Sequence, residues 1–206
     1  MKKLLLFALI GCPLLAQSAA LSLSCSSTVR AGSSLTCSIA LSGGSLPAGL
    51  QWTLGTSSPV GIVLVTPAAA TTAAQKSVAC NAVNTCLLTG INANQIADGV
   101  LAILTIPIPA ASPGQQMNLS LSGAIGASLA GTAIATNVNP PVSVSMLSGC
   151  DIDGDGQSSA TDVAAQRNGV LAIPQTASDL NQDGKLDVVD VQIVINAARG
   201  LACTAQ

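Results

Sequence analysis

The feature that most constrains this chain is the placement of its carboxylates. It contains nine Asp and no Glu, and every Asp except Asp98 lies within residues 151–190. Two segments of that region, residues 151–162 and 179–190, align with each other. Each has an oxygen-bearing side chain at positions 1, 3, 5, 9 and 12 and a Gly at position 6. An acidic pattern repeated in register predicts two copies of one local structure rather than a general solubilising charge.

The spacing of these oxygens is typical of a calcium-binding loop. Calcium takes six to eight oxygen ligands; position 7 supplies its backbone carbonyl and position 9 often acts through a water molecule. Gly at position 6 allows the sharp turn. Without metal the four Asp of each loop repel one another, so we expect the ions to supply folding energy; two polar turns that bind nothing are the alternative. We predict two Ca²⁺ ions, held by Asp151, Asp153, Asp155, Gln157, Ser159, Asp162, Asp179, Asn181, Asp183, Lys185, Asp187 and Asp190.

A helix is expected directly after each loop. Apolar residues continue at helical spacing past both position-12 residues, and Gly200 is a helix stop signal. No comparable helical pattern precedes either loop, so each unit is a loop followed by a helix, which is half of an EF-hand. The residues of the expected helical stripes are Val163, Arg167, Val170 and Leu171 after the first loop, and Val191, Val194, Ile195 and Ala198 after the second.

Residues 21–146 have the pattern of short β-strands. Apolar and small polar residues alternate around Leu35–Leu41, Leu50–Leu54, Met117–Leu121 and Val142–Met146, which predicts strands with one buried face. Residues 100–106 are almost continuously apolar and are expected to lie centrally in a sheet. Gly, Pro and Asn separate these runs, so we expect about eight or nine strands in a β-sandwich. The composition changes between Met146 and Cys150, where we place the domain boundary.

The N-terminus and the cysteines indicate export. Residues 1–20 combine two Lys, an apolar run and small residues that offer cleavage after Ser18 or after Ala20, as in a signal peptide. The alternative is a lipobox, with lipid attached to Cys12. The apolar run is too short to span a bilayer, and no later segment qualifies. The remaining six Cys allow fifteen pairings, of which nearness along the chain favours Cys25–Cys37, Cys80–Cys86 and Cys150–Cys203; buried free thiols are the alternative.

The duplicated loop and helix, residues 151–201, resemble a type I dockerin, a calcium-dependent module that binds a cohesin domain. The resemblance implies that partner choice depends on loop positions 10 and 11 and on residues further along each helix. These positions are Ala160, Thr161, Arg167, Val188 and Val189. The resemblance also implies that the ends of the module meet, so Cys150 and Cys203 would close it in a dockerin spanning residues 149–206.

The β-domain, residues 21–146, is similar to cohesin domains. Residues 50–54 and 96–104 carry this resemblance. It implies a nine-stranded jelly-roll sandwich, related to carbohydrate-binding modules, that binds dockerins. The expected fold is therefore a β-sandwich followed by a small α-helical dockerin with two EF-hand-like calcium loops.

These expectations point to a secreted, non-catalytic adaptor that joins cohesin- and dockerin-bearing proteins. Polysaccharide is a further candidate partner. The alternative is a carbohydrate-binding protein anchored by its dockerin; sugar platforms use exposed aromatic rings, and Trp52 is expected to pack in the core instead. An enzyme is disfavoured because the chain has no His and, outside the loops, only Asp98 as a carboxylate. A net charge of -2 disfavours nucleic acid as a partner.

Overall fold

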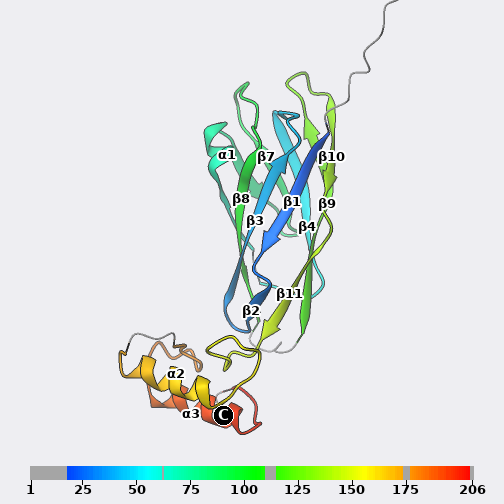
Figure 1. The fold of residues 1–206 in the computed structure, drawn as a ribbon. Helices are drawn as coiled ribbons and strands as arrows, with labels where there is room; N and C mark the ends of the chain where they lie inside the picture. Colours follow the sequence, from blue (N-terminus) through cyan, green and yellow to red (C-terminus); the bar gives the residue numbers. More distant parts are fainter. Residues whose placement is uncertain (1–17, 62, 110–114, 174–176, 205–206) are drawn as a thin grey trace, which may run out of the picture.

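The computed structural model describes residues 18–61, 63–109, 115–173 and 177–204, which form a long β-sandwich with a small helical region at one end (Figure 1). The expected signal segment and Cys12 lie outside the described residues, apart from residues 18–20. In chain order the elements are β1 (Ala19–Cys25), β2 (Thr28–Arg30), β3 (Ser34–Ser42), β4 (Gly49–Thr56), β5 (Leu64–Pro67), α1 (Ala69–Ala73), β6 (Ser77–Cys80), β7 (Thr85–Thr89), β8 (Gly99–Pro107), β9 (Gln116–Ala127), β10 (Ala133–Val138), β11 (Val142–Leu147), α2 (Ala160–Val170) and α3 (Val188–Ala198).

The strands form two layers that are joined along one edge. One layer has the order β5-β8-β3-β1, and the other has β10-β9-β4-β7-β6, with β11 paired to β9 and β2 paired to β11. The parallel pair β1–β10 connects the two layers. A sandwich or barrel-like β-domain is therefore confirmed. Eleven strands are described rather than the eight or nine expected, because β2, β5 and β6 are too short to produce a visible alternation.

The core follows the alternation of the sequence. In β3 the buried positions Leu35, Cys37, Ile39 and Leu41 alternate with exposed or half-buried ones. β8 lies between β3 and β5, as the continuous apolar run predicts. Trp52 is fully buried, so the prediction that its ring packs in the core is confirmed. The short helix α1 was not expected; Thr71 anchors it by donating its hydroxyl to the carbonyl of Leu101, at 2.7 Å.

All three predicted disulfides are present. Cys25–Cys37 links β1 to β3, whose antiparallel register places the two residues opposite each other, and Cys80–Cys86 links β6 to β7 in the same way. The chain turns between the first pair at residues 30–33, where Ser33 N donates to Arg30 O at 3.2 Å and Gly32 has a φ of 81°. Cys150–Cys203 joins the start of the helical region to its end.

The helical region has a second, small core. Helices α2 and α3 pack against each other, beyond the end of the sandwich where β2 and β11 lie (Figure 1). The buried apolar residues there are Cys150, Ile152, Ile193 and Val194. The expected α3 is confirmed, and Gly200 follows its end with a φ of 85°. The expected stripe of α2 is only partly buried: Val163 packs against this core, but Leu171 is exposed. The fully buried side chains of α2 are polar, Asp162 and Gln166.

None of the helices in the described residues has both the length and the apolar character that a membrane crossing requires.

Candidate calcium loops and docking surfaces

The first loop gathers carboxylates as its spacing predicts. Oxygens of Asp151, Asp153 and Asp155 all lie within 4.8 Å of one another. Gly156, at position 6, has a φ of 94°, a backbone conformation that costs a side-chain-bearing residue energy. Three carboxylates this close repel one another unless a cation lies between them. The arrangement is therefore a ligand set that suits a hard cation, which prefers oxygen ligands.

Backbone N–H groups orient the carboxylates of the first loop. Asp151 is fully buried, and its Oδ1 and Oδ2 accept from the N–H groups of Gly154 (2.7 Å) and Gly156 (2.8 Å). Asp153 Oδ1 accepts from Asp155 N at 3.1 Å, and Asp155 Oδ1 accepts from Gln157 N at 2.8 Å. Each oxygen has a second lone pair, so these bonds orient the carboxylates and leave them able to bind a metal ion.

Asp162, at position 12, closes the loop and also begins α2. Its Oδ1 accepts from Ile152 N (2.6 Å) and Asp153 N (3.0 Å), and its Oδ2 accepts from Ser159 N (2.7 Å). Ser159 and Asp162 form a capping box at the helix start. Burial raises the pKa of Asp162, but the backbone N–H groups of Asp153, Ser159 and Ile152 and the Ser159 hydroxyl lower it by more. The pKa therefore lies below its ordinary value, and the charged form is favoured.

The second loop repeats this arrangement with one difference. Asp179 Oδ2 accepts from Gly184 N at 2.9 Å, whereas its Oδ1 is buried and has no hydrogen-bond partner in the described residues. Asp190 is fully buried and accepts from Leu180 N (2.7 Å) and Asp187 N (3.0 Å). A buried carboxylate oxygen without a partner is costly, and a bound cation would relieve that cost. The donor set of this loop therefore fits calcium.

The other predicted ligands differ in exposure and in hydrogen bonding. Gln157 and Lys185 are exposed, which suits positions that would bind through the backbone carbonyl. Asp187 and Ser159, at position 9, accept hydrogen bonds from Val189 N (2.8 Å) and Thr161 N (3.3 Å) as helix N-caps. This capping role was not predicted from the sequence. In the second loop, Asn181 Oδ1 accepts from Asp183 N at 3.2 Å.

Two residues near the loops were missed from sequence. Gln166, fully buried in α2, donates its Nε2 to Ser178 O (2.6 Å) and accepts from Ser178 N (3.0 Å), which holds the chain just before the second loop. Arg30, from the end of β2, donates to the backbone carbonyls of Asp151 and Ile152 at the first loop. An amide or guanidinium has no periodic signature, so only the tertiary structure identifies these contacts.

The five predicted partner-binding residues are all exposed. Ala160 and Thr161 lie at the start of α2, with Arg167 further along it, and Val188 and Val189 begin α3. Val188 and Val189 are 73% and 45% exposed, although valine is normally buried. They therefore do not pack into the local core, and remain available to contact another protein.

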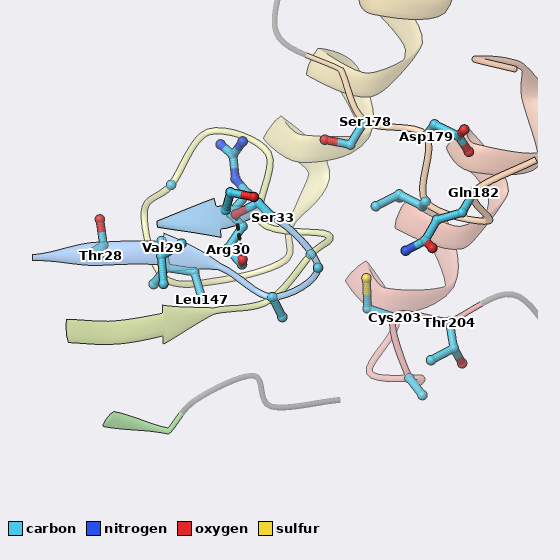
Figure 2. A pocket seen from close by; sticks show the side chains of 17 residues that line it. Thr28, Val29, Arg30, Ser33, Leu147, Ser178, Asp179, Gln182, Cys203 and Thr204 are labelled. Carbon is cyan, nitrogen blue, oxygen red and sulfur yellow. Dashed lines mark hydrogen bonds between the residues drawn. The ribbon is translucent and has the colours of Figure 1, made fainter. Parts of the chain in front are cut away.

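The surface of the described residues is hollowed at the junction of the two regions and on the sandwich. A groove of about 640 Å³ separates the sandwich from the helical region, with Arg30 and Ser33 on one side and Asp179 and Gln182 on the other (Figure 2). A smaller hollow of about 270 Å³ lies over β4, β7 and β9. There Gln51 is paired with both Leu87 and Ile125 across neighbouring strands, and the two apolar side chains are 48% and 46% exposed.

The residues considered for catalysis and sugar binding have structural contacts. Asp98 accepts from the backbone N–H of Gly44 (3.1 and 3.2 Å) immediately before β8. Trp52 presents no ring face to solvent because it is fully buried.

Comparison with known proteins separates the two parts of the chain. Residues 149–197 match the family model described as the dockerin type I domain, and type I dockerin domains bind calcium. No curated protein sequence matches the chain.

Solved structures match the N-terminal part. A cohesin module from a Clostridium perfringens family 33 glycoside hydrolase has 12% identity and a TM-score of 0.53, with 64% of this chain and 98% of that chain covered. A type I cohesin–dockerin complex from Clostridium thermocellum has 16% identity and a TM-score of 0.49, covering 63% and 95%. A non-cellulosomal cohesin from the archaeon Archaeoglobus fulgidus has 12% identity and a TM-score of 0.49, covering 64% and 92%.

Dockerin and cohesin-like domains are typically non-catalytic interaction modules and generally extracellular. The chain thus carries a dockerin type I domain at residues 149–197, preceded by a β-domain with the cohesin fold.

Proposed function

We propose that this protein is a secreted, non-catalytic adaptor that joins other proteins through calcium-dependent cohesin–dockerin contacts. The observation that carries the proposal is the combination in one chain of a dockerin match at residues 149–197 with a cohesin-like sandwich before it. A molecule with both modules could be bound through its helical end and bind a partner through its sandwich.

The helical region would take up two Ca²⁺ ions, one in each loop. The clustered oxygens of Asp151, Asp153 and Asp155 and the unpartnered Oδ1 of Asp179 support this assignment. Each loop has four Asp, so without the ions like charges would face one another in partly buried positions. We therefore expect the helices to lose order when calcium is removed.

The helical surface around Val188, Val189, Ala160, Thr161 and Arg167 would bind a cohesin-bearing partner. Exposed apolar side chains that are adjacent to polar ones are typical of docking surfaces. Val188 and Val189 are exposed while Ile193 and Val194 of the same helix are buried, so α3 has one face for its own core and another for a partner.

The sandwich would bind a dockerin-bearing partner through its own apolar surface. Leu87 and Ile125 flank Gln51 on three neighbouring strands beside the 270 Å³ hollow. Sugar binding by this face has less support, because Trp52 is buried and no other aromatic ring occurs in the described residues. A part in polysaccharide degradation would therefore come through the proteins that the adaptor joins.

Export would leave a mature chain that begins at Ala19. Ala19 is fully buried and is paired with Thr136 of β10, so cleavage after Ala20 would remove the first two residues of β1. Intact-mass analysis of protein recovered from the medium should give the mass of residues 19–206 less the hydrogens lost in three disulfides. A chain that begins at Leu21, or one carrying lipid on Cys12, would contradict this assignment.

Size-exclusion chromatography tests the adaptor proposal. The full chain would be run alone and with each of several purified type I cohesin domains and type I dockerin domains, in calcium and again in excess EDTA. A calcium concentration of roughly 10⁻² M is about tenfold above the dissociation constants of the weakest extracellular calcium loops. We expect co-elution with at least one cohesin in calcium and its loss in EDTA. If neither these domains nor a second copy of the chain bound in calcium, the proposal would be wrong.

A further inference from the structure

Arg30 is the one arginine of the sandwich that contacts a candidate calcium loop among the described residues. It ends β2, which pairs in parallel with β11 so that Arg30 lies beside Leu147. Ala31 N also donates to Leu147 O at 2.9 Å. The backbone of Arg30 is therefore held next to the point where the chain leaves the sandwich, and its side chain is half-buried in the groove wall (Figure 2).

The guanidinium holds two successive peptide groups of the first loop. Nε donates to Asp151 O and Nη2 donates to Ile152 O. The N–H ends of the same two peptides, Ile152 N and Asp153 N, donate to Asp162 Oδ1 at 2.6 and 3.0 Å. A peptide whose carbonyl is bound by a cationic donor is a stronger N–H donor. Arg30 therefore acts through these peptides on Asp151 and Asp162, the two ends of the predicted ligand set.

The second loop lacks this support. Its equivalent N–H groups, Leu180 N and Asn181 N, lie 2.7 and 3.4 Å from Asp190 Oδ1. In the parts of the chain that the structure describes, no side chain is recorded as a donor to the carbonyl of Asp179 or Leu180. The two loops are alike in sequence, but among the described residues only the first receives side-chain hydrogen bonds from the sandwich.

We propose that Arg30 is a positioning residue for calcium binding at the first loop, so that the sandwich sets the calcium affinity of the dockerin's first site. This inference rests on the calcium binding proposed above. Two effects of Arg30 oppose each other: its charge repels a cation, whereas its hydrogen bonds hold the ligands in place. The charge is partly exposed and screened by solvent. Removing a partner that orients a metal ligand costs about 10–100-fold in metal affinity, so the positioning effect prevails.

Calcium titration of the ¹⁵N-labelled full chain by NMR measures the two sites separately. Gly156 N donates to Asp151 Oδ2 and Gly184 N donates to Asp179 Oδ2, so each amide reports on its own loop. We expect Arg30→Ala to move the midpoint for Gly156 to about tenfold higher calcium, with the midpoint for Gly184 unchanged. Arg199→Ala is the matched control, because it removes the same charge from an exposed position after α3.

Arg30→Lys separates geometry from charge. Lysine keeps the positive charge but cannot place two fixed N–H groups on two carbonyls, so we expect the Gly156 site to be weakened here too. If Arg30→Ala bound calcium at Gly156 equally well or more tightly, or if both glycine sites weakened equally, the positioning role would be wrong. If neither amide of the unaltered protein responded to calcium, the proposed calcium binding would itself fail, and this inference with it.

Discussion

At the scale of single residues, the candidate loops use the same side chains for two purposes. Ser159 and Asp162, like Asp187 and Asp190, cap the following helix while belonging to the predicted calcium ligands. Loop and helix are therefore coupled: a change in the loop's carboxylates alters the N-terminus of the helix directly. Asp179 differs from these four residues, because its buried Oδ1 has no hydrogen-bond partner in the described residues.

The unpartnered oxygen of Asp179 predicts that Asp179→Asn has opposite effects on stability with and without calcium. In EDTA the substitution removes one of several repelling charges, so the helical region should be equally or more stable. In calcium the substitution removes a charged ligand. A calcium concentration of 100 times the dissociation constant stabilises the folded state by about 2.7 kcal/mol per site, and most of this stabilisation would be lost. Thermal unfolding followed by circular dichroism at 222 nm measures both.

Asp98→Asn is the matched control, since Asp98 is the Asp outside the loops. It should unfold with the same calcium dependence as the unaltered protein. A stabilising effect of calcium that survives Asp179→Asn in full would exclude Asp179 as a ligand.

Gln166 provides a second residue-scale prediction. Gln166→Leu keeps the buried volume but leaves the N–H and carbonyl of Ser178 without their partner. We expect the helical region to lose about 1–3 kcal/mol of stability in urea unfolding. Gln192→Leu, on the exposed side of α3 where the amide contacts only Asn196 in the described residues, should change stability by less than about 0.5 kcal/mol. Equal effects of the two substitutions would contradict the role of Gln166.

At the scale of elements, strands were more predictable than the helix α2. Alternation located β3, β4, β9 and β11 because one face of each is buried, and a continuous apolar run located β8. The buried side chains of α2, in contrast, are Asp162 and Gln166, which the search for an apolar stripe passes over. A helix that packs in so small a core depends on polar contacts and covalent links for much of its stability.

The Cys150–Cys203 disulfide is therefore expected to matter most for this region. It closes a sequence separation of 53 residues, against 6 for Cys80–Cys86. On the chain-entropy account the first contributes about 4 kcal/mol and the second about 2 kcal/mol. The double substitution of Cys150 and Cys203 by Ser should lower the urea midpoint of the 222 nm signal. The same change at Cys80 and Cys86 should leave that signal unaffected; the reverse result would contradict this ranking.

At the scale of the whole molecule, the helical region lies at the end of the sandwich formed by β2 and β11, with the 640 Å³ groove between them (Figure 1). The exposed pair Val188 and Val189 belongs to the helical region, whereas the surface around Leu87 and Ile125 belongs to the sandwich. An adaptor requires two surfaces that act independently, so a change in one should leave the other's binding intact.

Val188→Asp tests whether the helical surface binds the cohesin partner. We expect calcium uptake to persist, while binding of a cohesin weakens by about 2 kcal/mol or more, or roughly 30-fold, as for a central contact of an interface. Val83→Asp is the control, because Val83 is 69% exposed on the turn between β6 and β7. Isothermal titration calorimetry, with a cohesin that binds the unaltered protein, compares the affinities of the two variants. Equal losses of affinity would show that Val188 has no specific part in the contact.

The sequence by itself determined the local features of this protein. The repeated oxygen spacing identified both loops, the alternation identified the longer strands, and nearness along the chain paired the cysteines, because each depends on residues close in sequence. The tertiary structure decided what distant residues do. It brought Arg30 into hydrogen bonds with the backbone carbonyls of Asp151 and Ile152, 121 and 122 residues away, and Gln166 into a hydrogen bond with the backbone of Ser178. Such contacts arise from the packing of one element against another, and a polar side chain that makes one has no sequence period to reveal it.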